Sequence, residues 1–169
     1  TISVMDERGK RPEEDQNLPR LYRFHFEGGV SAYVRHLNHD KAGIGDVIWF
    51  QEDAKEGFVE VALQYSQAFQ EQTISFANNI HTTEGGTHLT GLRAALTKTL
   101  NTYGTSHNLL KELKAGLSGE DAREGLTCIV SVKHPDPSFD SQTKSKLVSS
   151  EVKGIVETIV NDGLGQFME

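Results

Sequence analysis

The sequence predicts an α/β fold, an α+β sandwich in which a mixed β-sheet is covered by helices on one face. The first observation is the order of segments, which reads strand, helix, three strands, helices, strand, helix. The second is periodicity, because apolar residues alternate in the strand-like segments and recur every three or four residues in the helical ones. The third is size: 169 residues, of which 36% are hydrophobic and 24% charged, suffice for one domain with a substantial core.

The N-terminal segment favours a strand over residues 1–5. It lacks an initiator methionine and a basic signal region, as expected for an excised fragment. Residues 6–20 are almost all charged, polar, glycine or proline, which indicates an exposed connection. We therefore expect a boundary near residue 20, followed by an alternating run over 21–26.

A short helix is predicted after Gly28 and Gly29, because apolar residues then recur at helical spacing as far as Asn38. Three strand-like runs follow, separated by turn-forming residues. They cover residues 47–50, 58–65 and 72–77 and predict an antiparallel meander.

The middle of the chain predicts a turn and helices. Two glycines in 84–88 can adopt backbone angles closed to other residues, and apolar residues at helical spacing then predict a helix over 89–103. A shorter helix is predicted over 108–113. Ser118, with acidic residues directly after it, resembles the cap of a further helix.

The C-terminal part predicts a buried strand over 126–132 and a long amphipathic helix over 150–167. The single cysteine, Cys128, lies in the strand and is best interpreted as a small buried hydrophobe. A lone cysteine cannot form an internal disulfide, so a cytoplasmic location is expected.

Composition excludes some classes of function. No apolar run approaches the ~20 residues that a bilayer span needs, so no membrane partner is expected. The net charge of −7 argues against a dedicated nucleic-acid-binding module. A local DNA-facing surface remains compatible, because Arg93 and Lys98 share a predicted helix with no acidic residue between Gly85 and Leu110.

The segment between the last strand and the last helix is the strongest candidate site. Its prolines, Pro135 and Pro137, predict a loop, and the string QTKSK (142–146) presents an amide and two ammonium groups from it. A lysine within ~4 Å of a phosphate oxygen would be attracted by roughly 4 kcal/mol at an effective dielectric near 20. From the string alone, two solvated lysines on a surface turn are the alternative.

Other motifs point less clearly to chemistry. His36 and His39 lie three residues apart near a helix end, but no further cluster of cysteine or histidine accompanies them, so no metal site is expected. The glycine pairs Gly43/Gly45 and 163/165 lack the third glycine of a dinucleotide-binding fingerprint, which favours turns and helix ends.

Long, specific strings occur from residue 21 to the end of the chain. They are FHFEGG (24–29), VEVALQY (59–65), SFANNIHTTEGGTHLTGLRAALTKTLN (75–101), SGEDAREGL (118–126), SVKHPDP (131–137), QTKSKL (142–147) and SSEV (149–152). In this order they resemble the transducer domain of the ATP-hydrolysing subunit of type IIA topoisomerases, that is, of DNA gyrase B and its topoisomerase IV counterpart.

The resemblance implies a fold shared with a domain of a small-subunit ribosomal protein. That fold includes a left-handed βαβ crossover, an exception to the usual right-handed rule. The resemblance also implies that residues 1–20 are the last strand and tail of a preceding GHKL-type ATPase domain, and that residues 21–169 are the transducer domain.

In this family, the lysine and the glutamine of the loop contact the γ-phosphate of ATP bound in the preceding domain. The aligned residues are Lys144 and Gln142, and Thr143 between them is a further ATP-binding candidate. A fixed ammonium and an amide can stabilise the charge on a transferring phosphoryl group. ATP and Mg²⁺ are expected in the full-length subunit, whereas the isolated segment is expected to bind neither and to be inactive.

The resemblance further implies that the segment couples ATP hydrolysis to DNA strand passage and negative supercoiling. The implied partners are the ATPase domain of the same polypeptide, a second copy of that polypeptide, the gyrase A protein and double-stranded DNA. Arg93 aligns with an arginine that faces the DNA cavity, and Lys98 is a looser candidate for the same surface.

Three alternatives stay open from the sequence. The first is the same domain of topoisomerase IV, which would serve decatenation. The second is a nucleic-acid-binding module of the same fold, which the acidic balance disfavours. The third is a transducer of a mismatch-repair relative, which should lack the strings EGGTH and SGEDAREG.

Overall fold

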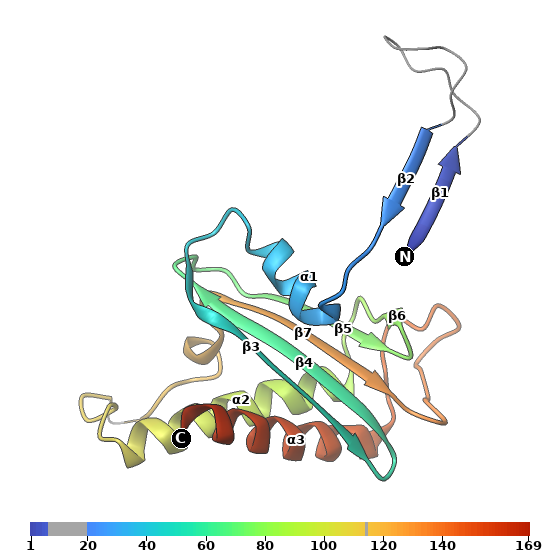
Figure 1. The fold of residues 1–169 in the computed structure, drawn as a ribbon. Coiled ribbons are helices and arrows are strands. Elements are labelled where there is room, and N and C mark those ends of the chain that lie inside the picture. The colour runs from blue at the N-terminus through green and yellow to red at the C-terminus, as the bar shows by residue number, and fades with distance from the viewer. Residues whose placement is uncertain (7–19, 114) are drawn as a thin grey trace.

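The computed structural model describes residues 1–6, 20–113 and 115–169. The predicted connection over 6–20 lies outside these residues except at its two ends. The elements, labelled in Figure 1, are β1 Ile2–Asp6, β2 Arg20–Phe24, α1 Gly29–Leu37, β3 Gly43–Ala54, β4 Gly57–Ser66, β5 Gln72–Ala77, β6 Ile80–His81, α2 Thr87–Ser106, the 3₁₀ turn η1 Asp121–Arg123, β7 Leu126–Lys133 and α3 Ser150–Met168.

The strands form two sheets. β1 and β2 pair antiparallel in a two-stranded sheet that projects from the rest of the molecule in Figure 1. The remaining strands form a five-stranded mixed sheet in the order β3-β4-β7-β5-β6, in which β5 and β7 are parallel and the other pairs are antiparallel. The mixed sheet confirms the predicted fold class.

The predicted meander is wrong in one respect, because β7 lies between β4 and β5. Every residue of β7 except Lys133 is buried. A strand that is buried on both faces is most stable at the centre of a sheet, where it has a neighbour on each side. β7 therefore pairs with β4 on one side and with β5 on the other. β4 and β5, which follow each other in the sequence, do not pair with each other.

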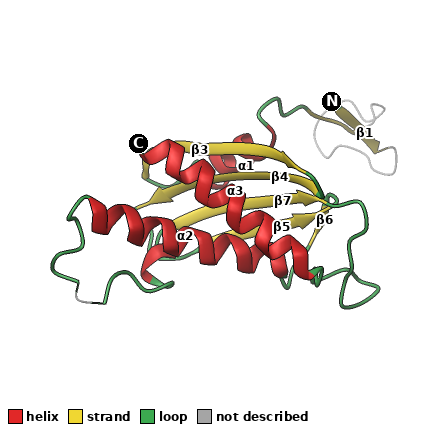
Figure 2. Ribbon diagram, turned by 90° about the horizontal axis from the view of Figure 1, so that it is seen from below, coloured by secondary structure: helices red, strands yellow, loops and turns green. Residues whose placement is uncertain are grey.

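The parallel pair β5–β7 is joined by a crossover that contains α2. In Figure 2, both strands run from left to right, α2 lies in front of the sheet, and β7 lies above β5. This arrangement is left-handed, as the resemblance implied, and is the uncommon hand for such a connection.

Helices cover both faces of the five-stranded sheet. α2 and α3 pack on one face over Val61, Leu63, Cys128 and Val130, which belong to the larger core. The prediction of helices on one face holds for these two, whereas α1 lies on the opposite face (Figure 1). There its Val34 packs against the alternate sheet residues Ala62 and Ile129, in line with the period of two along a strand.

α2 and α3 run parallel, side by side. Thr99 Oγ1 on α2 donates a hydrogen bond of 2.7 Å to Asn161 Oδ1 on α3. Eight residues earlier on each helix, Gly91 lies so close to Lys153 that an added Cβ would be 2.5 Å from the Lys153 carbonyl oxygen. The absence of a side chain at Gly91 therefore allows the two backbones to approach, and both helices begin at the same end of the molecule (Figure 2).

Two smaller predictions fared differently. The segment 108–113 forms turns rather than a helix, and Asn108 has a positive φ of 59°, which a continuing helix does not allow. Ser118 makes reciprocal hydrogen bonds of the capping type, but the N-cap position itself is Glu120: Ser118 Oγ accepts from Asp121 N at 3.1 Å, and Asp121 Oδ2 accepts from Ser118 N at 2.9 Å. The element that follows is only the single turn η1.

Within the described ranges, no helix is long and apolar enough to cross a membrane.

Candidate functional site

The segment that contains Gln142, Thr143 and Lys144 forms a hairpin between β7 and α3, here called the Lys144 hairpin (138–148). Its two arms pair through hydrogen bonds from Asp140 N to Lys146 O at 3.1 Å and from Val148 N to Ser138 O at 2.9 Å. An antiparallel bridge joins the arms between these two bonds. The predicted loop is therefore an ordered structure with a defined tip.

The tip is a tight turn that exposes all three candidate side chains. Lys144 N donates to Ser141 O at 3.1 Å, and the hydroxyls of Ser141 and Thr143 lie 2.8 Å apart. Lys144 has a φ of 57°, a left-handed conformation that is uncommon for a residue with a side chain and costs on the order of 1 kcal/mol. Such strain persists only where the surrounding structure holds the backbone in place.

The ammonium of Lys144 is not paired with a carboxylate among the described residues. Its Nζ lies 5.7 Å from the centroid of the Phe139 ring, within the range of a cation–π contact. An aromatic face orients a cation without neutralising its charge. The Lys144 ammonium thus remains available to an external anion.

The turn at residues 84–87, called the 84–87 turn, holds the second arm of the hairpin. Glu84 N donates to Ser145 O at 2.9 Å, Leu147 N donates to Gly85 O at 3.1 Å, and Thr87 N donates to Leu147 O at 3.0 Å. These bonds fix the residue directly after Lys144, and Leu147 is fully buried.

Gly86 is the residue that makes this contact possible. Its φ is 140°, and an added Cβ would overlap the backbone of Leu147. Only glycine combines that conformation with such a close approach. The two glycines of the predicted turn therefore serve to seat the hairpin on the first turn of α2.

A buried polar network supports the 84–87 turn from below. Thr82 Oγ1 donates to Ser75 O at 2.9 Å and lies 3.0 Å from His88 Nε2. When the Thr82 hydroxyl donates to Ser75 O, its oxygen can accept from His88 Nε2–H. Burial lowers the pKa of His88 to about 4, which agrees with a neutral ring.

Arg93 and Lys98 lie further along α2, roughly 9 Å and 17 Å of helix beyond Thr87, given a rise of about 1.5 Å per residue. Lys98 is exposed, whereas the Arg93 side chain is 42% exposed. The structure therefore does not bring these two residues to the tip of the Lys144 hairpin.

Arg93 belongs to an ion-pair group, the Glu71 cluster (Glu71, Arg93, Arg123). Arg93 Nε and Nη2 donate to Glu71 Oε1 at 3.1 and 2.7 Å, and Arg123 Nε donates to Glu71 Oε2 at 2.9 Å. Burial alone would raise the pKa of Glu71, but hydrogen bonds from Arg93, Arg123 and Thr73 outweigh it and lower the pKa. The carboxylate thus stays ionised and bridges η1 and α2.

His36 and His39 do not converge on a common point. Their rings stack, with centroids 5.6 Å apart, and His39 Nδ1 lies 2.8 Å from the carbonyl oxygen of His36. In the part of the chain that the structure describes, no group of three or more potential metal-ligating side chains is found.

The sequence comparisons with known proteins identify the family. The sequence profile described as DNA gyrase B matches residues 29–169, which is most of the chain. The chain belongs to the DNA gyrase B family. This confirms the resemblance found in the sequence.

Individual DNA gyrase B relatives extend the match. The DNA gyrase B protein of Bacillus mycoides is 48% identical over 157 residues, which cover 92% of this chain and 39% of that protein. The DNA gyrase B protein of Haloferax lucentense is also 48% identical over 157 residues, which are 25% of its length. The chain therefore spans between a quarter and two fifths of these two relatives.

A solved structure of this family has the same fold. The 43K ATPase domain of Thermus thermophilus gyrase B, solved in complex with an aminocoumarin, superposes with a TM-score of 0.81 at 29% identity. The superposition covers 92% of this chain and 42% of that one. The overall fold of this chain is thus shared with a gyrase B protein.

Sequence reasoning found the tip of the hairpin but missed the residues that hold it and its neighbours. Glu71 and Arg123 lie 52 residues apart and were joined by no local pattern. Thr82 and His88 both lie in the family string over 75–101, yet only the packing reveals their contact. The sequence did carry a signal for Gly86, since a glycine pair directly before a helix indicates backbone angles or a close approach that other residues do not allow.

Proposed function

We propose that this chain is the transducer segment of the ATP-hydrolysing subunit of a DNA gyrase. In this role it couples ATP binding and hydrolysis to DNA strand passage and negative supercoiling. The observation that carries the proposal is the Lys144 hairpin. Its tip exposes an amide and an ammonium that pairs with no carboxylate among the described residues, while its second arm is fastened to the start of α2. Membership of the DNA gyrase B family supports it.

The chemical role of the tip follows from charge. Lys144 and Gln142 would contact the γ-phosphate of ATP bound by the preceding domain, and Thr143 would line the same site. During phosphoryl transfer the negative charge is spread over the phosphoryl oxygens, so a positioned ammonium and an amide donor lower the barrier electrostatically. ATP and Mg²⁺ would be bound by residues of the full-length subunit outside this chain.

The mechanical role follows from the attachment of the hairpin. Its second arm is bonded to the first turn of α2, and its chain continues directly into α3. Loss of the γ-phosphate would remove the anchor of Lys144, so that the parallel pair α2–α3 could move against the ATPase domain as a ligand-controlled switch.

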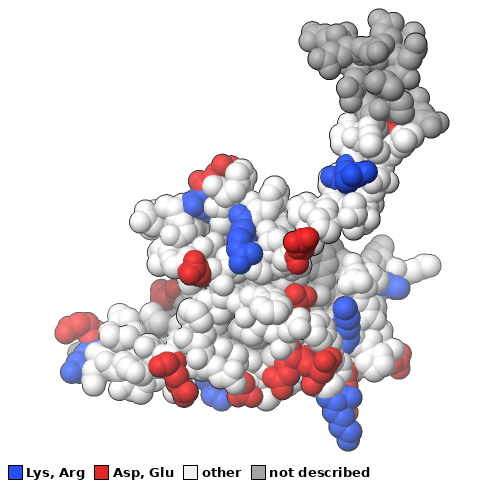
Figure 3. All heavy atoms as spheres, in the orientation of Figure 1, with Lys and Arg blue, Asp and Glu red and all other residues white. Residues whose placement is uncertain are grey.

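Arg93 and Lys98 are proposed to face the DNA segment that passes through the enzyme. Arg93 uses one edge of its guanidinium on Glu71 and keeps 42% of its side chain exposed, so further N–H groups can donate to phosphate. On the face drawn in Figure 3, acidic and basic side chains are interspersed. That face is therefore not a basic binding surface, and the proposed contact of Arg93 and Lys98 with DNA would involve a few phosphates.

The domain assignment is part of the proposal. Residues 1–20 would belong to the preceding GHKL-type ATPase domain and residues 21–169 to the transducer domain, with β1 and β2 pairing across this boundary. The proposed partners are the ATPase domain, a second copy of the same polypeptide, the gyrase A protein and double-stranded DNA. The proposed location is the cytoplasm.

The test is Lys144→Ala in the full-length subunit, with Lys146→Ala as the matched control on the same hairpin. We expect kcat for ATP hydrolysis to fall about a hundredfold in Lys144→Ala, the order seen when one transition-state donor is removed, and to change less than about twofold in Lys146→Ala. KM for ATP should change little. An unchanged kcat in Lys144→Ala would remove the catalytic assignment.

A second measurement separates gyrase from topoisomerase IV. The full-length protein, reconstituted with the other protein of the enzyme, should introduce negative supercoils into relaxed DNA in the presence of ATP. Decatenation without supercoiling would instead identify the topoisomerase IV counterpart.

A further inference from the structure

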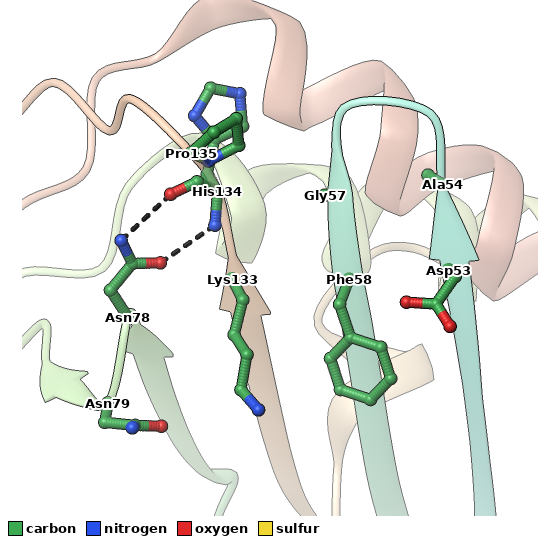
Figure 4. A pocket seen from close by; sticks show the side chains of 9 residues that line it. All are labelled: Asp53, Ala54, Gly57, Phe58, Asn78, Asn79, Lys133, His134 and Pro135. Atoms are coloured by element: carbon green, nitrogen blue, oxygen red, sulfur yellow. Dashed lines mark hydrogen bonds between the residues drawn. The ribbon is translucent and has the colours of Figure 1, made fainter.

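Asn78 holds the point at which β7 leaves the sheet and the segment leading to the Lys144 hairpin begins. Its Nδ2 donates to His134 O at 2.9 Å, and its Oδ1 accepts from His134 N at 2.8 Å (Figure 4). The backbone N–H of Asn78 also donates to Val132 O at 2.8 Å. One residue thus makes three hydrogen bonds to the end of β7.

These bonds extend the β5–β7 ladder beyond its last backbone pair. That pair joins Ala77 to Val132, and Asn78 then turns away with a φ of 49°. Its side-chain amide takes the place of the next strand residue, because it offers one donor and one acceptor as a peptide group does. The backbone of His134 is therefore held although β5 has already ended.

The ring of His134 ties the same point to α3. Its side chain is only 10% exposed, and its Nδ1 accepts from Asp136 N at 3.2 Å. Its Nε2 lies 3.3 Å from Glu151 Oε1 in the first turn of α3. The connection from β7 to α3 thus begins at a residue that is held against the start of α3.

Only three residues separate His134 from the first arm of the hairpin, and two of them are Pro135 and Pro137. Proline fixes its own φ and restricts the residue before it, so this short link is stiff. A displacement of His134 is therefore passed on to Ser138, which pairs with Val148 in the hairpin. The 84–87 turn holds the second arm, and Asn78 holds the approach to the first.

We propose that Asn78 is a positioning residue for Lys144, acting through His134 and the stiff proline link. The inference rests on the proposed contact of Lys144 with the γ-phosphate. With both arms held, the ammonium spends more of its time at the geometry that the transferring phosphoryl group requires. Without Asn78, the first arm gains freedom, and the fraction of productive geometry falls.

The chain offers a matched control in Asn79. Both residues are exposed asparagines with positive φ, 49° for Asn78 and 64° for Asn79. Among the described residues, the amide of Asn79 makes no hydrogen bond, and Figure 4 shows it pointing away from His134. Substitution by glycine suits both positions, because glycine adopts positive φ without strain.

The experiment compares Asn78→Gly with Asn79→Gly in the full-length subunit. We expect kcat for ATP hydrolysis to fall about threefold to tenfold in Asn78→Gly, with KM for ATP unchanged, since two neutral hydrogen bonds are lost. Asn79→Gly should retain wild-type kcat. A thermal unfolding scan of both variants separates this effect from a general loss of stability.

A second comparison places each variant in the Lys144→Ala background. If Asn78 acts by positioning Lys144, Asn78→Gly should cause no further loss of kcat there. Wild-type kcat in Asn78→Gly, or an equal loss in both backgrounds, would overturn the inference while leaving the role of Lys144 intact. Failure of the proposed function would instead appear as an unchanged kcat in Lys144→Ala itself.

Discussion

At the start of α2 the backbone of the Lys144 hairpin is held by backbone hydrogen bonds, whereas about two turns further along Arg93 is held by a carboxylate. Ser145 and Leu147 are bonded to the 84–87 turn, and within the described part of the chain the Lys144 ammonium lies over the Phe139 ring and pairs with no carboxylate. In the Glu71 cluster, the side chains of Arg93 and Arg123 share one carboxylate.

The difference shows two ways of presenting a cation. Backbone bonds fix Lys144 without using its charge, so its full attraction for an anion is kept. The Glu71 cluster fixes Arg93 by partly compensating its charge, which orients the guanidinium but weakens its field. The first arrangement suits a strong contact with one phosphate, and the second suits a weaker contact with a passing polyanion.

The largest effect is expected from breaking the backbone attachment with Gly86→Ala. The added Cβ would overlap Leu147 at a φ of 140°, so the free energy of unfolding should fall by at least about 3 kcal/mol. Urea unfolding of the chain measures this.

Gly154→Ala is the control for that substitution. No atom lies within 4 Å of an added Cβ at Gly154, which is inside α3, so the free energy of unfolding should rise by roughly 0.5–1 kcal/mol. Equal responses of the two variants would show that the hairpin is not seated through Gly86.

A smaller effect is expected from acid at the network below the 84–87 turn. Burial lowers the pKa of His88 from 6.5 to about 4, so the unfolded chain takes up the proton first as the pH falls. The stabilisation is complete above the unfolded pKa and is lost on acidification. The contribution of His88 should therefore decrease by roughly 2 kcal/mol between about pH 7.5 and about pH 5.

Unfolding of wild type and His88→Gln over this range checks the sign and the size. The variant should be less stable at neutral pH but should lose less stability on acidification. A wild-type slope in the variant would assign the pH dependence to other groups.

The stability that the Glu71 cluster contributes should depend on the charge of Glu71 and not on the backbone conformation. Glu71→Gln is expected to lower the free energy of unfolding by about 1 kcal/mol, a value reduced because Arg93 is 42% exposed. The pKa of Glu71 is lowered in the fold, so its contribution is present above the ordinary pKa of about 4.3 and is lost as the pH falls through the lowered value.

Denaturation at low and high salt checks this prediction. The difference between wild type and Glu71→Gln should shrink as salt screens the partly exposed pair. Glu157→Gln, which removes only the partner of Lys153 on the same helix, should change stability by no more than about 0.5 kcal/mol. An effect of Glu71→Gln as small as this control would remove the cluster as a structural contact.

The smallest effect is expected from Arg93→Gln. In the full-length enzyme, it should lower DNA-stimulated ATP turnover by about twofold to fivefold and affect basal turnover less, because a phosphate contact contributes only part of DNA binding. The loss should diminish at higher salt. Identical stimulation at all DNA concentrations would contradict a role in DNA contact.

Much of the local structure could be predicted because it depends on local periodicity. The helix expected over 150–167 is α3, and the buried strand expected over 126–132 is β7. The helix expected over 108–113 failed because Asn108 adopts a positive φ, which helical spacing of leucines cannot reveal. β6 has only two residues, too few for alternation to be detected.

The candidate site was predictable at its tip and not at its supports. The strings around Gln142 and Lys144 identify the family, because long ordered matches are specific. The supports consist of contacts such as Asn78 with His134, 56 residues apart, and Glu71 with Arg93, 22 residues apart. Such pairs leave no periodic trace in a single sequence.

The sequence by itself determined most of the strands and helices, which of their faces are apolar, and which side chains the hairpin offers to a ligand. The tertiary structure alone decided that β7 separates β4 from β5, that α1 covers the second face, and that the hairpin rests on α2. The physical reason is that periodicity specifies the face that a segment must bury, whereas the neighbour that covers it is chosen by the packing of the whole chain.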